Sequence, residues 1–237
     1  KHLVTKNDAI NALRDWIARL KEGKRLDLMR PYRIYDLTPV EVKRRERKFG
    51  DFSTLNKKLI SSTSENNFKT IQNNVELWYA YHRSLNENKK SWPFDPNDVW
   101  ISKIAKLPKS RKIADFGCGE AIIGKKFGKT RVRSFDLHAD DEEFVQECNI
   151  RSVPLRAKSI DVVVYNLSLM GTDWKEILQE GNRVLKDGGL MFIADTKNHL
   201  DGYLKDIRNV LEDLDFNIFR YDDKKEPFVL IEAIKDF

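Results

Sequence analysis

The sequence contains few cysteines and no long apolar run, and each shortage excludes a class of protein. Only Cys118 and Cys148 occur among 237 residues, so neither a framework of several disulfides nor a zinc site of four cysteines can form. No segment approaches the roughly 20 uninterrupted apolar residues of a transmembrane helix, and no apolar signal region follows the charged N-terminus. We therefore expect an intracellular protein that makes no membrane contact. Because the chain begins at Lys1 without a methionine, we expect it to be a piece of a longer protein.

The charge of the chain is distributed unevenly. The formal net charge is +6, but residues 1–109 hold 23 Lys and Arg against 13 Asp and Glu, whereas residues 110–237 hold 20 against 24. A basic segment joined to a slightly acidic one is typical of a polyanion-binding arm on a domain that binds a small molecule. A solvated basic surface without a partner is the alternative.

The clearest helix start in the basic half is the segment Thr38 to Glu41. Threonine at the cap, proline at the first helical position and glutamate at the third can satisfy the free amides of a helix N-terminus. This helix would end at Gly50 and carry five cations in six positions, Lys43, Arg44, Arg45, Arg47 and Lys48. Crowded cations repel one another and are stabilised by phosphates. We expect nucleic acid, RNA by preference, to bind this basic cluster. A solvated surface without a partner is an alternative of equal weight.

The rest of the first half predicts helices joined by polar turns. Residues 61–67 indicate a polar loop. An apolar stripe follows at helical spacing, made of Phe68, Ile71, Val75, Trp78 and Tyr79. This pattern favours side chains that pack in the core over a platform on which bases stack. The Trp92–Pro93 segment breaks this helix, and Asp95 with Pro96 starts another that ends before Pro108. We place the domain boundary here, with a helical basic region at 1–92 and a second domain at 93–237.

From Lys112 onward, short β-branched or aromatic runs alternate with helical segments. The runs are Ile113–Phe116, Val132–Asp136, Ile160–Asn166, Leu190–Thr196, Phe216–Tyr221 and Phe228–Ala233. This alternation predicts an α/β fold with a doubly wound parallel sheet. Only residues 222–227 separate the last two runs, which is too short for a helical crossover, so the closing pair must be antiparallel. A parallel sheet with an antiparallel closing hairpin is unlike a dinucleotide dehydrogenase.

A glycine loop follows the first predicted strand. Asp115–Phe116–Gly117–Cys118–Gly119 leads into a helix, and its glycines let the chain bend sharply and let a ligand approach the backbone. Ile122 stands where a dinucleotide-binding loop has its third glycine, which weakens a pyrophosphate interpretation. Asp136 ends the second strand 21 residues after Asp115, the spacing at which a carboxylate meets ribose hydroxyls in this topology.

The loop, the acidic strand end and the closing hairpin together resemble the class I S-adenosylmethionine-dependent methyltransferases. Over residues 78–237 the chain resembles more closely the ribosomal RNA-processing protein 8, or nucleomethylin, family. The matching segments are Tyr81–Arg83, Trp92–Pro93, Ala114–Gly119, Ser134–Leu137, Val153–Leu155, Leu167–Thr172 and Asn182–Lys186. The resemblance implies a Rossmann-like methyltransferase domain with S-adenosylmethionine as cofactor and no metal. It implies methylation of an adenine N1 in large-subunit ribosomal RNA, in the nucleolus.

The resemblance also assigns site residues position by position. Cofactor contacts of the family fall on His82, Gly117, Asp136, Asn149, Ile150 and Asn166, to which we add Asp115, Cys118, Gly119, Leu137 and Leu167 beside them. Asn149 replaces an aspartate of the family, and its carbonyl can accept a hydrogen bond from adenine without a charge. Asn166 replaces an expected cysteine beside the reacting sulfonium and is the candidate catalytic residue. Cys118, without a nearby histidine in the sequence, is a small filler and not a nucleophile.

Three other functions stay open. Asn166 to Leu169 resembles the Asn-Pro-Pro-aromatic motif of adenine-N6 methyltransferases without its prolines or aromatic residue, so an N6 or other tRNA or DNA methyltransferase is one alternative. A non-catalytic module that senses the cofactor and binds chromatin or RNA is the second. A protein methyltransferase is disfavoured, because the basic arm would repel basic substrates. N1 of adenine has a free lone pair and needs no base, which fits a sequence without an obvious catalytic dyad.

Overall fold

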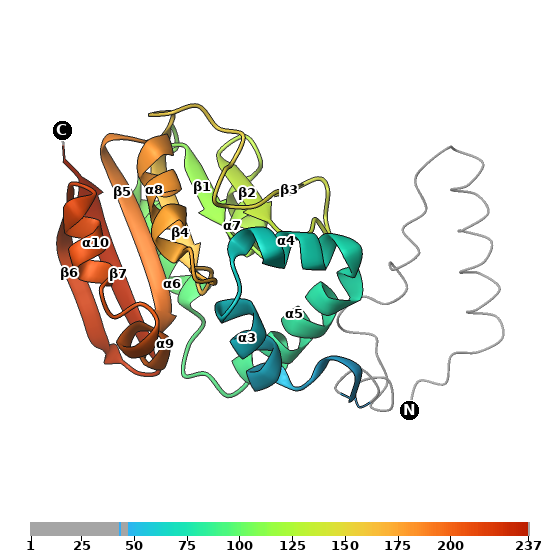
Figure 1. The fold of residues 1–237 in the computed structure, drawn as a ribbon. Helices are drawn as coiled ribbons and strands as arrows, with labels where there is room; N and C mark the ends of the chain where they lie inside the picture. The colour runs from blue at the N-terminus through green and yellow to red at the C-terminus, as the bar shows by residue number, and fades with distance from the viewer. Residues whose placement is uncertain (1–42, 44–46, 237) are drawn as a thin grey trace, which may run out of the picture. The chain divides into compact units, whose positions relative to one another are not determined.

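The computed structural model describes Lys43 and residues 47–236 (Figure 1). The chain divides between Lys43 and Arg44, and residues 44–237 form one compact unit. The helix start predicted at Thr38 and the cations Arg44 and Arg45 lie outside the described residues. The predicted helix end is confirmed, because Phe49 is helical and Gly50 has a φ of 94°, which glycine adopts without strain. The domain boundary at residues 92 and 93 stays a prediction.

Helices α3 (Phe52–Ile60), α4 (Ser64–Asn73) and α5 (Val75–Lys89) follow Gly50, ahead of the sheet. The polar loop predicted at residues 61–67 is wrong beyond Thr63, because the Thr63 side chain accepts from the Asn66 amide and starts α4 at Ser64. The apolar stripe therefore continues across a break at Asn74 between two helices. Trp78 and Tyr79 are buried as predicted, at 2% exposure each.

The following helix, α6 (Pro96–Lys106), has the predicted bounds. Asp95 accepts from the Asn97 amide at its N-terminus, Pro96 occupies the first turn, and the helix ends before Pro108. The Trp100 ring stacks on Phe192 of the sheet at 5.2 Å and 11°, so α6 is packed against the sheet through a fully buried aromatic pair.

The sheet has seven strands in the order β3-β2-β1-β4-β5-β7-β6. Their bounds are β1 (Ile113–Phe116), β2 (Val132–Asp136), β3 (Val145–Glu147), β4 (Ile160–Asn166), β5 (Leu185–Thr196), β6 (Phe216–Lys225) and β7 (Phe228–Lys235). The first five strands pair in parallel, and β7 pairs antiparallel with both β5 and β6. The predicted parallel sheet with an antiparallel closing hairpin is confirmed. Strand β3 was not predicted, and β5, β6 and β7 are longer than predicted.

Helices cover both faces of the sheet. On one face, α8 (Trp174–Val184), α9 (Lys197–Gly202) and α10 (Ile207–Asp213) bury apolar side chains with Phe116 and Tyr165. On the other, α6 and α7 (Ile122–Phe127) bury Trp100 and Ile123 against the sheet. Alternating side chains of a strand point to opposite faces, so the central strands β1 and β4, buried on both, are apolar except at Asp115, Asp161 and Asn166. No helix in the described part of the chain is both long and apolar enough to span a membrane.

Helices α3 to α5 lie beyond the carboxyl ends of β1, β2 and β4 (Figure 1). The Ser64 amide and hydroxyl donate to the buried Asp173 carboxylate at 2.7 and 2.5 Å, and the Thr172 amide donates to the Ser62 carbonyl at 2.9 Å. Gln72 Nε2 donates to the Leu137 carbonyl at 2.9 Å. These contacts hold the helices over the edge of the sheet where ligands bind in open α/β folds.

Candidate active site

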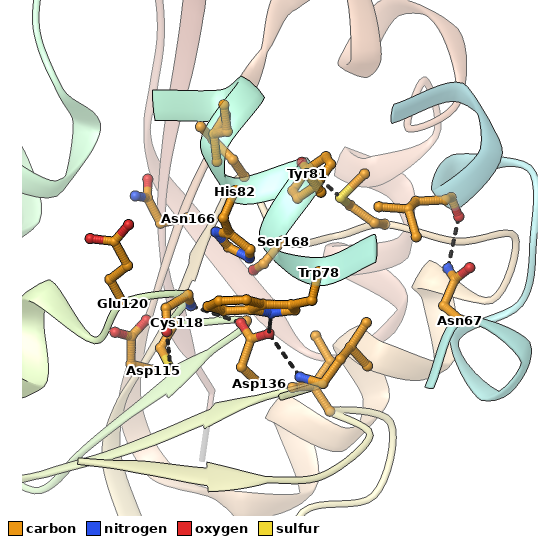
Figure 2. Close-up of a pocket in the computed structure, with 18 of the residues that line it drawn as sticks. Asn67, Trp78, Tyr81, His82, Asp115, Cys118, Glu120, Asp136, Asn166 and Ser168 are labelled. Atoms are coloured by element: carbon orange, nitrogen blue, oxygen red, sulfur yellow. Dashed lines mark hydrogen bonds between the residues drawn. The ribbon is translucent and has the colours of Figure 1, made fainter. Parts of the chain in front are cut away.

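A pocket lies between the carboxyl edge of the sheet and helices α3 to α5 (Figure 2). The space between its walls, with the open solvent at its mouth included, is about 1120 Å³. All eleven predicted site residues line it: His82, Asp115, Gly117, Cys118, Gly119, Asp136, Leu137, Asn149, Ile150, Asn166 and Leu167. Their roles as cofactor ligands stay a prediction, which the contacts below support.

The glycine loop has no room for side chains at Gly117 or Gly119. Both have positive φ values, 71° and 53°, a conformation that favours glycine. A Cβ at Gly117 would overlap the Ser168 side chain, and one at Gly119 would come within 2.8 Å of the His82 ring. The amides of Gly117 and Cys118 both donate to the Phe135 carbonyl, which joins the loop to β2 and leaves its backbone facing the pocket.

The Asp136 carboxylate is the centre of a hydrogen-bond network. Its Oδ1 accepts from Trp78 Nε1 and from the Leu137 amide, both at 2.8 Å, and its Oδ2 accepts from the Gly119 amide at 2.7 Å. Each carboxylate oxygen has two lone-pair directions, so Oδ2 keeps one for a ligand. Asp136 thus joins α5 to the glycine loop and still offers an acceptor to the pocket.

Trp78 belongs to the site as well as to the core, which the apolar stripe did not reveal. Its indole lies between Asp136 and the His82 ring, with ring centroids 4.0 Å apart (Figure 2). Burial lowers the pKa of His82 although the Asp136 and Glu120 carboxylates act in the opposite direction. The imidazole is therefore neutral at physiological pH and can donate one hydrogen bond and accept another.

The pKa values of the Asp115 carboxyl group and the Cys118 thiol are both raised above their ordinary values. Burial, with a smaller effect of Asp136, raises the pKa of Asp115 to about 7. Burial also raises the pKa of the Cys118 thiol well above its ordinary value, and the nearby carboxylates add to the shift. A protonated thiol is a weak nucleophile, so the structure supports the prediction that Cys118 fills space in the loop.

Asp115→Asn is expected to flatten the pH dependence of stability. A carboxyl group whose pKa rises on folding binds its proton more tightly in the folded protein, so the free energy of unfolding falls as pH rises from 3.8 to about 7. Asparagine has no such proton. Thermal unfolding measured between about pH 4 and pH 7.5 should show the Tm of the parent falling relative to that of the variant. Parallel curves would mean that Asp115 ionises at its ordinary pKa.

Asn149 and Ile150 also line the pocket. Asn149 Oδ1 accepts from the Arg151 amide at 3.0 Å, and its Nδ2 lies 3.4 Å from Glu65 Oε2 of α4. Its carbonyl oxygen keeps one lone pair. Ile150 is buried at 7% exposure and offers an apolar contact. An amide beside an aliphatic side chain suits a planar heterocycle.

Two polar atoms at the end of β4 have no hydrogen-bond partner. Asn166 Oδ1 and Ser168 Oγ are both buried and unpaired, and both residues line the pocket. An unsatisfied buried polar atom costs about 1–3 kcal/mol, so such atoms in a pocket indicate a ligand that completes them. The sequence assigned a role to Asn166. Ser168 lies in the Asn166–Leu169 segment that resembles the adenine-N6 motif, but it was given no role of its own, because a serine in a loop gives no signal by itself.

Other pocket residues also escaped prediction. The Tyr81 hydroxyl lies 3.4 Å from Met170 Sδ, and the Tyr81 ring stacks on Phe52 at 5.8 Å. Asn86 Nδ2 donates to Glu120 Oε1 at 2.7 Å, so α5 contacts the glycine loop a second time. No three His, Cys, Asp or Glu side chains of the described residues are grouped so that they could hold a metal ion.

Comparison with known proteins gives a consistent family. The family model described as "Hypothetical methyltransferase" matches residues 40–236. The chain is 34% identical over 185 residues to ribosomal RNA-processing protein 8 of Dictyostelium discoideum, covering 78% of this chain and 47% of that protein. It is 36% identical over 174 residues to the 25S rRNA (adenine(645)-N(1))-methyltransferase of Schizosaccharomyces pombe, covering 68% and 54%. The chain spans about half the length of these curated relatives.

Among solved structures, the [4+2]-cyclase SpnF is similar in fold. The TM-score is 0.51 at 13% identity, over 75% of this chain and 97% of the cyclase. The strand order and this likeness confirm the class I methyltransferase fold that the sequence predicted. Since one fold can support different reactions, the function has to be inferred from the site.

Proposed function

The chain belongs to the family of hypothetical methyltransferases that includes ribosomal RNA-processing protein 8, and we propose that it methylates N1 of an adenine in large-subunit ribosomal RNA with S-adenosylmethionine. The observation that carries this proposal is the pair of unpaired acceptors, Asn166 Oδ1 and Ser168 Oγ, in the pocket that the glycine loop and Asp136 also line. The name of the Schizosaccharomyces pombe relative, a 25S rRNA (adenine(645)-N(1))-methyltransferase, supplies the product and the substrate class. Because ribosomal RNA is the proposed substrate, we also propose that the protein works in the nucleolus.

The residues of the pocket fit the proposed cofactor. Asp136 Oδ2 has a lone pair left for the ribose hydroxyls. The Gly117–Gly119 backbone is bare enough for the methionine part to approach, and Asn149 with Ile150 suits the adenine ring. When bound, the cofactor supplies a methyl group on a positively charged sulfur.

The chain's own residues have to position the base and exclude water. Adenine N1 carries a lone pair at neutral pH, so no residue has to remove a proton before the attack. The protonated Cys118 thiol and the neutral His82 are consistent with a site without a strong base. We assign Asn166 Oδ1 to accept a hydrogen bond from the amino group of the target base, which orients N1. The target adenine has to be unstacked to enter the pocket.

Adenine-N6 methylation is the second candidate. The same unpaired acceptors, Asn166 Oδ1 and Ser168 Oγ, could bind an exocyclic amine while its nitrogen is the nucleophile. The two candidates therefore require the same residues and differ in which nitrogen is methylated.

The basic cluster at residues 43–48 is proposed as an RNA contact. Of its five cations, Lys43, Arg47 and Lys48 are described and exposed, and Lys48 pairs with Glu76 at 2.7 Å. Replacing all five, Lys43, Arg44, Arg45, Arg47 and Lys48, by glutamine should weaken RNA binding for every sequence and reduce its salt dependence. S-adenosylmethionine binding should survive. If the variant bound RNA like the parent at every salt concentration, the basic cluster would be a solvated surface that does not contact RNA.

Transfer of label from S-adenosylmethionine to ribosomal RNA tests the proposed function. The protein should label naked large-subunit RNA that lacks the modification. RNA that already carries it should accept no label. If the protein bound the cofactor but transferred no label to any RNA, we would conclude that it is a non-catalytic binding module.

A further inference from the structure

Residues 103–133, which span the boundary between the basic first half and the acidic second half of the chain, are strongly basic. They contain ten Lys and Arg but only two acids, Asp115 and Glu120, and both of these acids line the pocket. Four of the ten cations pair with acids outside the segment: Lys103 with Glu232, Arg111 with Asp161, Lys125 with Asp141 and Lys129 with Glu143. The positive charge of the segment is therefore compensated only in part. This concentration is separate from the basic cluster at residues 43–48.

The fold gathers these cations at the amino edge of β1 and β2, where α6 and α7 end. Arg131 Nη2 donates to three carbonyls at the end of α6, those of Ile104, Leu107 and Pro108, at 3.0, 3.2 and 3.2 Å. Lys112 Nζ donates to the Thr130 carbonyl at 2.7 Å. The end of α6, the loop before β1 and the loop before β2 are thus held together.

We define the α6–α7 basic surface as five of these cations: Lys106, Lys109, Lys112, Lys126 and Arg131. The four lysines are exposed and Arg131 is half-buried. None of the five has an ion-pair partner among the residues that the structure describes, whereas their neighbours Lys125 and Lys129 pair with Asp141 and Glu143. A helix C-terminus favours cations at Lys106 and Lys126. It does not account for Lys109 and Lys112, which lie beyond the helix.

Two neighbouring helices connect the pocket with this surface. Asn97 at the start of α6 lines the pocket, and so do Glu120 and Ile122 at the start of α7. Both helices run from there to the basic surface, and they contact each other. The eleven residues of α6 span about 16 Å at 1.5 Å per residue. Along α7, Lys126 lies four residues beyond Ile122, about 6 Å, and along α6 Lys106 lies nine residues beyond Asn97, about 14 Å, at 1.5 Å per residue. The basic surface therefore begins outside the pocket and extends away from it.

We propose that the α6–α7 basic surface binds backbone phosphates of the RNA that flanks the target nucleotide, as a second contact outside the pocket. The inference rests on the proposed function, because RNA as substrate identifies the polyanion. Five cations without carboxylate partners match a phosphate backbone, which releases counterions when it binds. The surface would help to bind a long RNA but would be irrelevant for an oligonucleotide that fills only the pocket.

The test compares two four-lysine variants with the parent. In the surface variant, Lys106, Lys109, Lys112 and Lys126 are replaced by glutamine. The control variant carries the same replacement at four exposed lysines elsewhere, Lys175, Lys205, Lys224 and Lys225. Both change the net charge equally, so a difference between them reports position. A third variant with arginine at the four surface positions retains the charge, and thermal unfolding of each variant checks folding.

Binding of a large-subunit RNA fragment and of an oligonucleotide of about five nucleotides is measured against salt. The surface variant should bind the long RNA at least about tenfold more weakly at 0.1 M salt, with a salt slope smaller by up to about 3, at about 0.7 per lost contact to a single strand. It should bind the oligonucleotide like the parent, and the arginine variant should bind both like the parent. Equal binding of the long RNA by the surface and control variants would overturn the inference. Binding of an acidic protein, and not of RNA, to the basic surface would also overturn it. Because binding is read without turnover, failure of the proposed methyl transfer is a distinguishable result.

Discussion

Asp136→Asn is expected to weaken S-adenosylmethionine binding about ten- to hundredfold. In Asp136, Oδ1 accepts from two protein donors and Oδ2 from one, so Oδ2 is the oxygen with a lone pair free for a ligand. In the variant Oδ2 becomes an amide nitrogen, which cannot accept a hydrogen bond from a ribose hydroxyl. Hydrogen bonds to a charged group contribute about 1.5–3 kcal/mol, and 1.4 kcal/mol is a factor of ten. Calorimetric titration of the folded variant with the cofactor measures the change.

Two companion variants separate binding from folding. Asp136→Ala removes the acceptor of three donors, Trp78 Nε1 and the Gly119 and Leu137 amides, so it should also lower stability by several kcal/mol, at about 1–3 kcal/mol per unpaired group. Trp78→Phe keeps the carboxylate and should affect cofactor affinity less than Asp136→Asn does. If the folded Asn variant bound the cofactor like the parent, Asp136 would not be a ligand.

Asn166→Ala is expected to reduce kcat at least about tenfold while changing cofactor affinity less than about threefold. Its Oδ1 is buried and unpaired, and we assign it to the target base. Loss of a hydrogen bond that orients the nucleophile lowers the rate, because the reacting atoms must lie about 3–3.5 Å apart and in line. Single-turnover kinetics with saturating cofactor, combined with calorimetry, separate the two effects.

Ser168→Ala is the matched control on the same segment. It removes the other unpaired polar atom without changing the strand end, and it should affect kcat less if Asn166 is the main contact with the base. If Asn166→Ala reduced cofactor affinity as much as it reduced kcat, Asn166 would bind the cofactor and not the target base. Equal kcat values for the variant and the parent would remove it from the reaction.

The central sheet was the most predictable part of the molecule. The observed bounds of β1, β2 and β4 are those predicted, because buried parallel strands are continuous apolar runs between polar turns. Strand β3 has only three residues, two of them exposed, so it carries no such pattern. The start of α4 was missed because Ser64 to Asn67 are polar, and the Thr63 cap and burial against Asp173 determine the helix there.

The site was predictable where a motif fixes it and not where packing does. Gly117, Gly119 and Asp136 follow from the geometry of a loop at a strand end. Trp78 did not, since an aromatic residue at helical spacing looks the same whether it fills the core or donates to a carboxylate. Its role depends on α5 lying over β2, a contact between residues 58 positions apart in the sequence.

Nucleoside analysis of RNA methylated by this chain tests the central claim most directly. Unmodified large-subunit RNA is incubated with the protein and S-adenosylmethionine, digested to nucleosides and separated against standards. We expect N1-methyladenosine, formed by the parent and greatly reduced in Asn166→Ala. N6-methyladenosine without N1-methyladenosine, or no methylated adenosine at all, would contradict the assignment.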